Sequence, residues 1–290
     1  SYLSDFVGGL AGYSEGNITN SYNDFTGQVN GDSWVGGLVG HNYYTGSIAN
    51  SFNEGSVNGT GIGTIIGGLV GYNYGSIANS YSTGSVTGTN DVGGLVGYNG
   101  TDAAAGIIRY SYSTGQVNSA GSRVGGFIGH NRLGVFTSNY WDTTTSGRGV
   151  GVGENGDTDM TDFTGLITGL TTPQMRQMGS FAGWLIAANG GSTAIWRIYE
   201  GSTYPLLRSF LTPASITASN AAKTYDGTPY NGGNGYTYST GSWDADYMGV
   251  FAYGGDSQGA INAGSYAIAP GGYYSHQQGY DITFVPGALT

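Results

Sequence analysis

Residues 66–86 read IGGLVGYNYGSIANSYSTGSV, and this stretch decides the fold because most of residues 7–147 repeats it. The opening hexapeptide occurs five times, at intervals of 28, 31, 26 and 32 residues. The copies are VGGLAG (7–12), VGGLVG (35–40), IGGLVG (66–71), VGGLVG (92–97) and VGGFIG (124–129). A second phrase follows each of them, as ITNSYNDFTGQV (18–29), IANSFNEGSV (48–57), IANSYSTGSV (77–86), IRYSYSTGQV (108–117) and a degraded TSNYWDTTTSG (137–147). Paired recurrence in a fixed order predicts a repeat protein.

The composition of the repeat favours strands over helices. Gly, Asn, Ser and β-branched residues dominate each unit, and such residues form poor helices. Each unit predicts two or three short strands separated by Gly, Asn and Ser turns. Stacked about 4.8 Å apart, consecutive units would form a parallel β-solenoid of about five coils over residues 1–147. The extra segments GTGIGT before Ile66 and TDAAAG (101–106) would then lie in loops.

Stacking in register would bring equivalent side chains together as ladders. The slot after the hexapeptide holds Tyr13, His41, Tyr72, Tyr98 and His130, and the next slot holds Ser14, Asn42, Asn73, Asn99 and Asn131. A third slot holds Tyr22, Phe52, Tyr81, Tyr112 and Tyr140. Asn side chains in register can bond along the stack, and rings can stack at the coil spacing. We expect the glycines at positive-φ corners or at close approaches of the backbone. The inward face of VGGLVG is left open, because the hexapeptide is apolar in both phases.

Charge and composition limit the classes of function. The 290 residues include 57 Gly, 24 Tyr and no Cys, and 18 acidic side chains against 8 basic ones give a net charge of −10. No Lys or Arg precedes Arg109, so the basic surface that nucleic acids or anionic membranes require is missing. No apolar run is long enough to span a bilayer, so we expect no membrane insertion. A Gly-rich, Cys-free β protein is typical of a large secreted bacterial protein, and the start within a repeat suggests a fragment.

The GGLVG…NSYSTGSV repeat resembles the GLUG motif of large bacterial exoproteins. These include adhesins of the two-partner secretion (filamentous-haemagglutinin-like) class, and the resemblance covers roughly residues 7–147. It implies a β-solenoid, a secreted or cell-surface location, adhesion and passage through an outer-membrane transporter. It implies no enzymatic activity.

Residues 148–212 are expected to close the array, because the end of a solenoid exposes strand edges and core. Thr172 as N-cap with Pro173 in the first helical turn predicts a short helix to about Met178. Met175, Met178 and Phe181 would form its apolar side. IWRIYEGSTYPLLR (195–208) alternates like a strand.

Residues 213–290 have a different pattern and are expected to form a small β-rich domain. TYDGTPY (224–230), NAGSYAI (262–268) and GYDITFVPGALT (279–290) resemble the YDG/MBG-type modules that occur in tandem in the same exoproteins. Residues 251–253 and 282–285 predict strands. β-grasp-like and Ig-like arrangements both fit this pattern. PGALT also resembles the FLTPASIT that opens the module, which suggests truncation at this end as well.

The carboxylates and histidines of the array do not predict a catalytic site. Asp24 and Glu54 occupy nearly equivalent slots, as a glycoside hydrolase pair could, but the next units have Thr83 and Thr114 there. We interpret the two acids as solvated turn residues. His41 and His130 lie three units apart, too far to share a metal, and are interpreted as substitutes for Tyr in a surface ladder. The sequence therefore predicts no enzyme.

The densest acidic cluster is GENGDTDMTD, with Glu154, Asp157, Asp159 and Asp162. Ca²⁺ prefers several oxygen ligands on a flexible loop, which makes these residues a weak calcium candidate. The spacing matches neither an EF-hand nor the tandem nonapeptide of Ca²⁺ β-rolls. A solvated loop without a cofactor is the favoured interpretation.

Aromatic side chains are the remaining binding candidates, because Tyr and Trp on flat β surfaces stack against sugar rings. The candidates are Tyr13, Tyr72 and Tyr98 in one ladder, Tyr43, Tyr44 and Tyr74 in the neighbouring loops, and Trp243 in the second module. Rings that only pack the coil surface are the alternative. The resulting hypothesis is a secreted bacterial surface or biofilm-matrix adhesin that contacts extracellular polysaccharide, host glycans or proteins on other cells. A carbohydrate-active β-helix enzyme and a ligand-free spacer remain as rivals.

Overall fold

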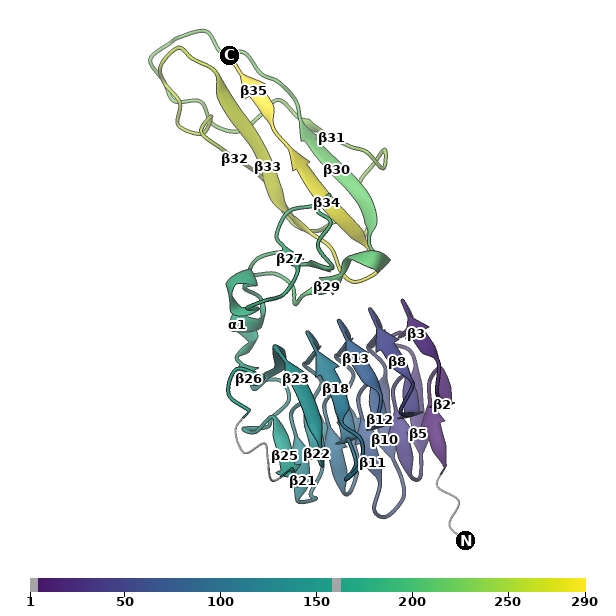
Figure 1. The fold of residues 1–290 in the computed structure, drawn as a ribbon. Helices are drawn as coiled ribbons and strands as arrows, with labels where there is room; N and C mark the ends of the chain where they lie inside the picture. Colours follow the sequence, from purple (N-terminus) through teal and green to yellow (C-terminus); the bar gives the residue numbers. More distant parts are fainter. Residues whose placement is uncertain (1–4, 158–162) are drawn as a thin grey trace. The chain divides into compact units, whose positions relative to one another are not determined.

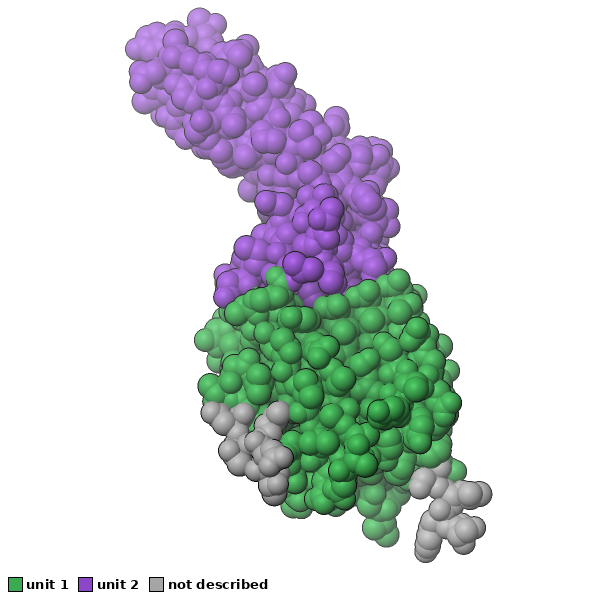
Figure 2. Space-filling model, in the orientation of Figure 1, with its two compact units in different colours: residues 1–175, 180–184 green, residues 176–179, 185–290 purple. Residues whose placement is uncertain are grey.

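The computed structural model describes residues 5–157 and 163–290. The chain divides into two compact units, shown in different colours in Figure 2. One unit comprises Ser1–Met175 and Ser180–Trp184, and the other comprises Arg176–Gly179 and Leu185–Thr290. The structure is of the all-β class, as the sequence predicts, with 45% strand and 4% helix, and each unit is described separately below.

The first unit is a parallel β-solenoid whose turns stack strand on strand (Figure 1). Each complete turn contributes one short strand to each of five parallel sheets. The hexapeptide supplies the first two sheets. The first contains β1 (Phe6–Gly8), β6 (Trp34–Gly36), β11 (Ile65–Gly67), β16 (Asp91–Gly93) and β21 (Arg123–Gly125). The second contains β2 (Ala11–Ser14), β7 (Val39–Asn42), β12 (Val70–Asn73), β17 (Val96–Asn99), β22 (Ile128–Asn131) and β25 (Val152–Asn155).

The second phrase of the repeat supplies the other three sheets. The third contains β3 (Asn17–Thr19), β8 (Ser47–Ala49), β13 (Ser76–Ala78), β18 (Gly106–Arg109) and β23 (Gly134–Thr137). The fourth contains β4 (Tyr22–Asn23), β9 (Phe52–Asn53), β14 (Tyr81–Ser82), β19 (Tyr112–Ser113), β24 (Asn139–Asp142) and β26 (Ile167–Leu170). The fifth contains β5 (Gln28–Gly31), β10 (Ser56–Gly59), β15 (Val86–Thr87) and β20 (Val117–Asn118).

The solenoid has about six turns, one more than the sequence predicts. The sixth turn contributes β25, which pairs with β22, and β26, which pairs with β24. Residues 152–155 read VGEN and keep the end of the repeat, as in VGYN (70–73), but the rest of the hexapeptide is degraded and 167–170 lacks the second phrase, so the turn is evident from backbone pairing. The solenoid therefore continues past the expected end at residue 147.

The three predicted ladders are confirmed by the strand register. Tyr72 pairs with His41 on one side and with Tyr98 on the other, and Tyr81 lies between Phe52 and Tyr112 in the same way. The rings of Phe52 and Tyr81 stack with centroids 4.9 Å apart and an interplanar angle of 4°. This separation matches the strand spacing, so like residues meet at each turn.

The asparagine ladder has a single direction along the stack. Asn42, Asn73, Asn99 and Asn131 each donate from Nδ2 to Oδ1 of the asparagine in the next turn, over 2.8 to 3.1 Å, and Asn155 receives the last bond. Side-chain amides carry both a donor and an acceptor, which lets the chain of bonds continue through the stack. Asn42 Oδ1 is buried without a donor among the described residues, because Ser14 takes the asparagine slot in the first turn.

Both phases of the hexapeptide face apolar interior, which answers the question left open by its sequence. Val35 packs in one buried cluster, whereas Leu38 and Val39 pack in another. The glycines between them allow the two strands of the hexapeptide to approach closely. A Cβ on Gly36 would lie 2.0 Å from Val39 O. The hexapeptide glycines do not have positive φ, so close approach explains them and positive-φ corners do not.

The end of this unit contains the helix α1 (Thr172–Met175), followed by Ser180–Trp184. The helix is shorter than predicted, and its cap lies one residue earlier. Thr171 donates from both its backbone N–H and its hydroxyl to Gln174 Oε1, each over 2.9 Å, so Thr171 is the N-cap. Phe181 and Trp184 pack against Tyr140, the last aromatic residue of its ladder. Trp184 also lies 6.3 Å from the Tyr112 ring, so these side chains pack along the last two rings of the ladder.

The second unit includes three three-stranded sheets, two of which lie within residues 212–290. β30 (Thr212–Ala218) pairs parallel with β34 (Tyr280–Val285) and antiparallel with β31 (Tyr236–Tyr238). β33 (Tyr266–Tyr274) pairs antiparallel with β32 (Met248–Gly254) and β35 (Gly287–Leu289). Both strands predicted in the module lie within β32 and β34. A β-grasp sheet packs on a helix, and residues 213–290 contain none, so that alternative is not supported.

Residues 185–212 belong with this second unit, although the sequence groups them with the solenoid cap. They contain β27 (Ile186–Ala187), β28 (Trp196–Arg197), β29 (Leu206–Leu207) and the 3-10 helix Arg208–Phe210. β28 and β29 pair antiparallel, so 195–208 forms two short strands and not one. Arg197, only 1% exposed, places Nε 3.2 Å from Asp281 Oδ1 on β34, and Arg208 also pairs with Asp281. These ion pairs join residues 185–212 to β34, so the second unit begins before the expected boundary at residue 213.

Candidate binding surface

Three successive turns of the solenoid form a groove at the corner between the second and third sheets. Its walls come from the segments that follow β7, β12 and β17, and it encloses about 480 Å³. The lining residues are Tyr44, Thr45, Gly46, Tyr74, Gly75, Ser76, Ala103, Ala104, Ala105 and Ile107. None of them is charged. The groove therefore offers two phenol rings, small side chains and backbone polar groups.

Differences in loop length between turns produce this groove. Residues 43–46 form a tight turn, closed by a 2.7 Å bond from Gly46 N to Tyr43 O, which leaves Tyr44 66% exposed. The corner of the next turn is shorter, and the Tyr74 ring packs edge-on against Tyr72 at 4.4 Å. The Tyr44 ring is therefore largely exposed to solvent, whereas the Tyr74 ring packs against Tyr72.

The inserted segment 101–106 forms the third wall. Thr101 Oγ1 accepts hydrogen bonds from the N–H groups of Ala103 and Ala104, at 3.2 and 2.9 Å, and Thr101 N donates to Ala104 O. These bonds hold the loop in one shape without a large side chain. The sequence located the insertion in a loop but gave no reason to include it in a site, because alanines carry no recognisable binding chemistry.

The predicted aromatic candidates separate into exposed and covered rings. Tyr13, Tyr43 and Tyr44 are exposed, whereas Tyr72 is only 8% exposed. Tyr72 stacks on Tyr98, with centroids 4.5 Å apart, and packs on Trp34 at 4.6 Å. Because neighbouring rings cover Tyr72, it supports the surface and does not present a free face. The prediction that Tyr72 is an exposed sugar-stacking residue is therefore wrong.

Trp243 does not join these tyrosines, because it belongs to the second unit. Its side chain is 57% exposed, and its indole Nε1 donates to Tyr247 O over 3.2 Å. The expected set of binding residues therefore divides into a solenoid group and one isolated tryptophan.

The two ladder histidines are buried, not on the surface as the sequence suggested. The His41 ring lies 5.2 Å from Phe6, 5.2 Å from Tyr13 and 5.1 Å from Trp34. Burial lowers the pKa of His41 to about 4, so the ring is neutral at pH 7. The first-sheet residues beside the ladder, such as Trp34, cover it, and only the tertiary structure places them there.

A charged cluster at the other end of the same ladder has no counterpart in the sequence interpretation. Arg123 Nε lies 2.7 Å from the buried Asp91 carboxylate, and an Arg123 NH group lies 3.2 Å from His130 Nδ1. Burial raises the pKa of Asp91 to about 6, although Arg123 opposes the shift. Glu154 lies 3.9 Å from His130 Nε2. The ladder thus changes from aromatic to ionic along its length.

The calcium candidate is only partly within the described residues. Glu154 lies on β25 opposite His130, and Asp157 is buried just after that strand, whereas Asp159 and Asp162 lie outside the described residues. Across residues 5–157 and 163–290, no three His, Cys, Asp or Glu side chains form a group that could hold a metal ion. Glu154 faces basic partners here, Arg123 and His130.

The paired acids considered for catalysis make structural hydrogen bonds. Asp24 Oδ1 accepts from the N–H and hydroxyl of Thr26 and from Gly27 N, which closes its turn. These bonds lower the pKa of Asp24. Glu54 accepts a 3.1 Å bond from the Tyr81 hydroxyl of the next turn. Both carboxylates accept hydrogen bonds from other residues of the solenoid.

Comparison with known proteins identifies the repeat. Residues 33–58, 62–87 and 88–118 match the family model described as the GLUG motif. The solenoid carries GLUG repeats. A 163-residue stretch is 33% identical to Halomucin of Haloquadratum walsbyi (strain DSM 16790 / HBSQ001) and covers 52% of this chain. The match spans only 2% of Halomucin.

No solved structure matches this chain. Nor does the part of the chain that the structure describes contain a helix long and apolar enough to cross a membrane.

Proposed function

We propose that this chain is part of a secreted protein of the bacterial surface or biofilm matrix, in which the GLUG solenoid is a stiff segment that contacts glycans. The groove formed by Tyr44, Tyr74 and residues 103–105 carries the proposal. The groove has one exposed phenol ring, Tyr44, and none of its lining side chains is charged. Its walls lie between strands of the solenoid that pair through their backbones. Aromatic rings bury the apolar face of a sugar, while backbone groups and hydroxyls bond its edge.

The match to Halomucin and the GLUG motifs support an extracellular or surface location. The absence of cysteine suits a chain that crosses a cell envelope unfolded. Within this proposal the chain is an adhesin of the two-partner secretion class, exported through an outer-membrane transporter, and residues 213–290 are a YDG/MBG-type module. Its partners are extracellular polysaccharides, host glycans or proteins on neighbouring cells, and it has no enzymatic activity, nucleic-acid partner or membrane-inserted segment.

A glycan array probed with the whole chain tests the proposal. We expect saturable binding that Tyr44→Ala weakens about 3- to 10-fold, because one aromatic stacking contact contributes about 0.5–1.5 kcal/mol. Phe25→Ala is the matched control, since Phe25 is 79% exposed and lies outside the groove. Equal affinity in the wild type and Tyr44→Ala would contradict the groove as the contact surface. A complete lack of glycan binding would instead favour a spacer without a ligand.

A further inference from the structure

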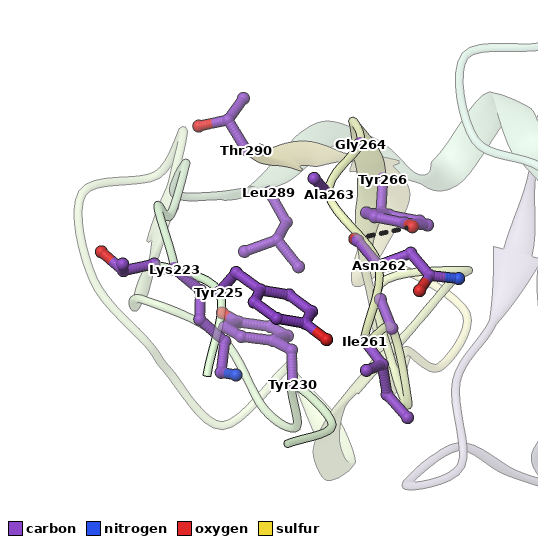
Figure 3. Close-up of a pocket in the computed structure, with 12 residues that line it drawn as sticks. Lys223, Tyr225, Tyr230, Ile261, Asn262, Ala263, Gly264, Tyr266, Leu289 and Thr290 are labelled. Atoms are coloured by element: carbon purple, nitrogen blue, oxygen red, sulfur yellow. Dashed lines mark hydrogen bonds between the residues drawn. The ribbon is translucent and has the colours of Figure 1, made fainter. Parts of the chain in front are cut away.

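Three sequence motifs of the second unit, well separated along the chain, meet at one pocket. They are TYDGTPY (224–230), NAGSYAI (262–268) and the final PGALT (286–290). Figure 3 shows the Tyr225 and Tyr230 rings on one side of the pocket, with Tyr266 and the turn 261–264 across from them. The pocket encloses about 110 Å³, and the buried Leu289 contributes an apolar surface to it.

The first motif forms a turn that presents Tyr225 to solvent. Asp226 Oδ1 accepts 2.8 and 2.7 Å bonds from the backbone N–H and the hydroxyl of Thr228. Gly227, between these residues, has φ +76°, which favours glycine. The Tyr225 side chain is 68% exposed, so the turn orders the backbone without covering the ring.

The other walls are also held by hydrogen bonds. Tyr230 exchanges backbone bonds with Ala260 and Gly259, at 2.9 and 2.7 Å, which fixes the end of the first motif beside the second. The Tyr266 hydroxyl donates 3.0 Å to Asn262 O and closes the NAG turn. The pocket is therefore a preformed feature with aromatic walls.

The pocket contains one charged side chain, and its charge is already compensated. The Lys223 ammonium pairs with the Asp226 carboxylate and also donates to the Thr228 carbonyl and hydroxyl, over 2.8 and 3.1 Å. These three bonds use all the donors of an ammonium group. The hydroxyls of Tyr225 and Tyr230 form no hydrogen bond with any described residue, so they are free to bond a ligand.

We propose that this pocket binds one ring of an uncharged saccharide. The ring would place its apolar face against the tyrosines and Leu289, and its hydroxyls would bond the two free phenols. A charged sugar would find no free counter-charge, since Lys223 and Asp226 neutralise each other. The site lies in a different unit from the solenoid groove and stands whether or not that groove binds glycans.

Saturation-transfer NMR with the whole chain and neutral methyl glycosides tests the proposal directly. We expect transfer to sugar-ring protons and a Kd that Tyr225→Ala raises about 3- to 10-fold, whereas Tyr225→Phe keeps the ring and most of the affinity. The Kd is measured in a Tyr44→Ala background, which weakens the solenoid groove, and there Phe25→Ala, an exposed aromatic outside both sites, should leave it unchanged. An unchanged melting temperature for Tyr225→Ala would show that the fold is intact.

The dependence on pH gives a second readout. Hydrogen bonds from Lys223 and Thr228 lower the pKa of Asp226, so the compensated pair persists in mild acid, and we expect the same Kd at pH 5 and pH 8. Three results would overturn the proposal. These are binding that survives Tyr225→Ala unchanged, binding of charged saccharides or extended peptides in place of neutral ones, and no saturable binding of any neutral glycoside.

Discussion

At the scale of single residues, the same ladder slot holds very different chemistry in different turns. His41 is neutral within a cluster of aromatic rings, whereas His130 lies among Asp91, Arg123 and Glu154. The repeat sets the position of each side chain, and its neighbours in the adjoining strand set its electrostatic environment. Asp91 is the clearest example, because it is buried beside a single arginine and has a raised pKa.

Asp91 predicts a specific dependence of stability on pH. Its pKa is about 6 in the folded protein against 3.8 as the reference, so the folded state binds this proton more tightly than the unfolded state. The ionised carboxylate therefore lowers the free energy of unfolding, a penalty that is absent below about pH 4 and complete above about pH 6. We expect Asp91→Asn to gain stability relative to the wild type between pH 4 and pH 7, measured by urea unfolding at each pH. A constant difference between the two proteins would contradict the raised pKa.

At the scale of elements, each turn needs one left-handed corner after the third strand. Asn20, Asn50 and Asn79 occupy it with φ of 46–49°, a conformation that asparagine tolerates well. Tyr110 and Ser138 take the same corner in the next two turns, with φ of 51° and 47°. The backbone keeps its path there although the side chain is less suited to it, because the strands on both sides are already paired.

The corner at Tyr110 predicts a stabilising substitution. Tyr110→Asn should raise the free energy of unfolding by about 0.5–1 kcal/mol, because it removes backbone strain and the tyrosine is only half-buried. The reverse change in an earlier turn, Asn79→Tyr, should cost a similar amount. Chemical denaturation of both variants measures the two effects, and a loss of stability in Tyr110→Asn would show that ring packing outweighs the strain.

At the scale of the whole molecule, the two units are stabilised in different ways. The solenoid depends on register, with ladders and two apolar clusters running through successive turns. The second unit depends on contacts between distant segments. Arg197 and Arg208 meet Asp281 there, and the Tyr199 hydroxyl donates to Tyr280 O over 2.6 Å and accepts from Ile282 N over 3.0 Å.

The buried ion cluster of the second unit predicts a large and localised loss of stability. Asp281→Ala leaves Arg197 buried without its counter-charge and should cost about 3–5 kcal/mol. Asp102→Ala removes an exposed partner of Arg132 and should leave the free energy of unfolding nearly unchanged. Hydrogen exchange should speed up in β28, β30 and β34 of the first variant while β12 and β17 stay protected. Equal effects of the two substitutions would contradict the assignment of a structural role to Asp281.

The sequence alone determined the solenoid, its ladders and the loop position of the 101–106 insertion. The same short pattern recurs in every repeat, and its spacing sets which residues lie in register. The sequence also identified Tyr44 and Tyr74 as binding candidates. The tertiary structure decided which rings are covered, where the sixth turn lies, that residues 185–212 join the second unit, and that three separate motifs form one pocket. These features depend on contacts between segments far apart in the chain, and a residue's exposure or pKa follows from neighbours that no local pattern specifies.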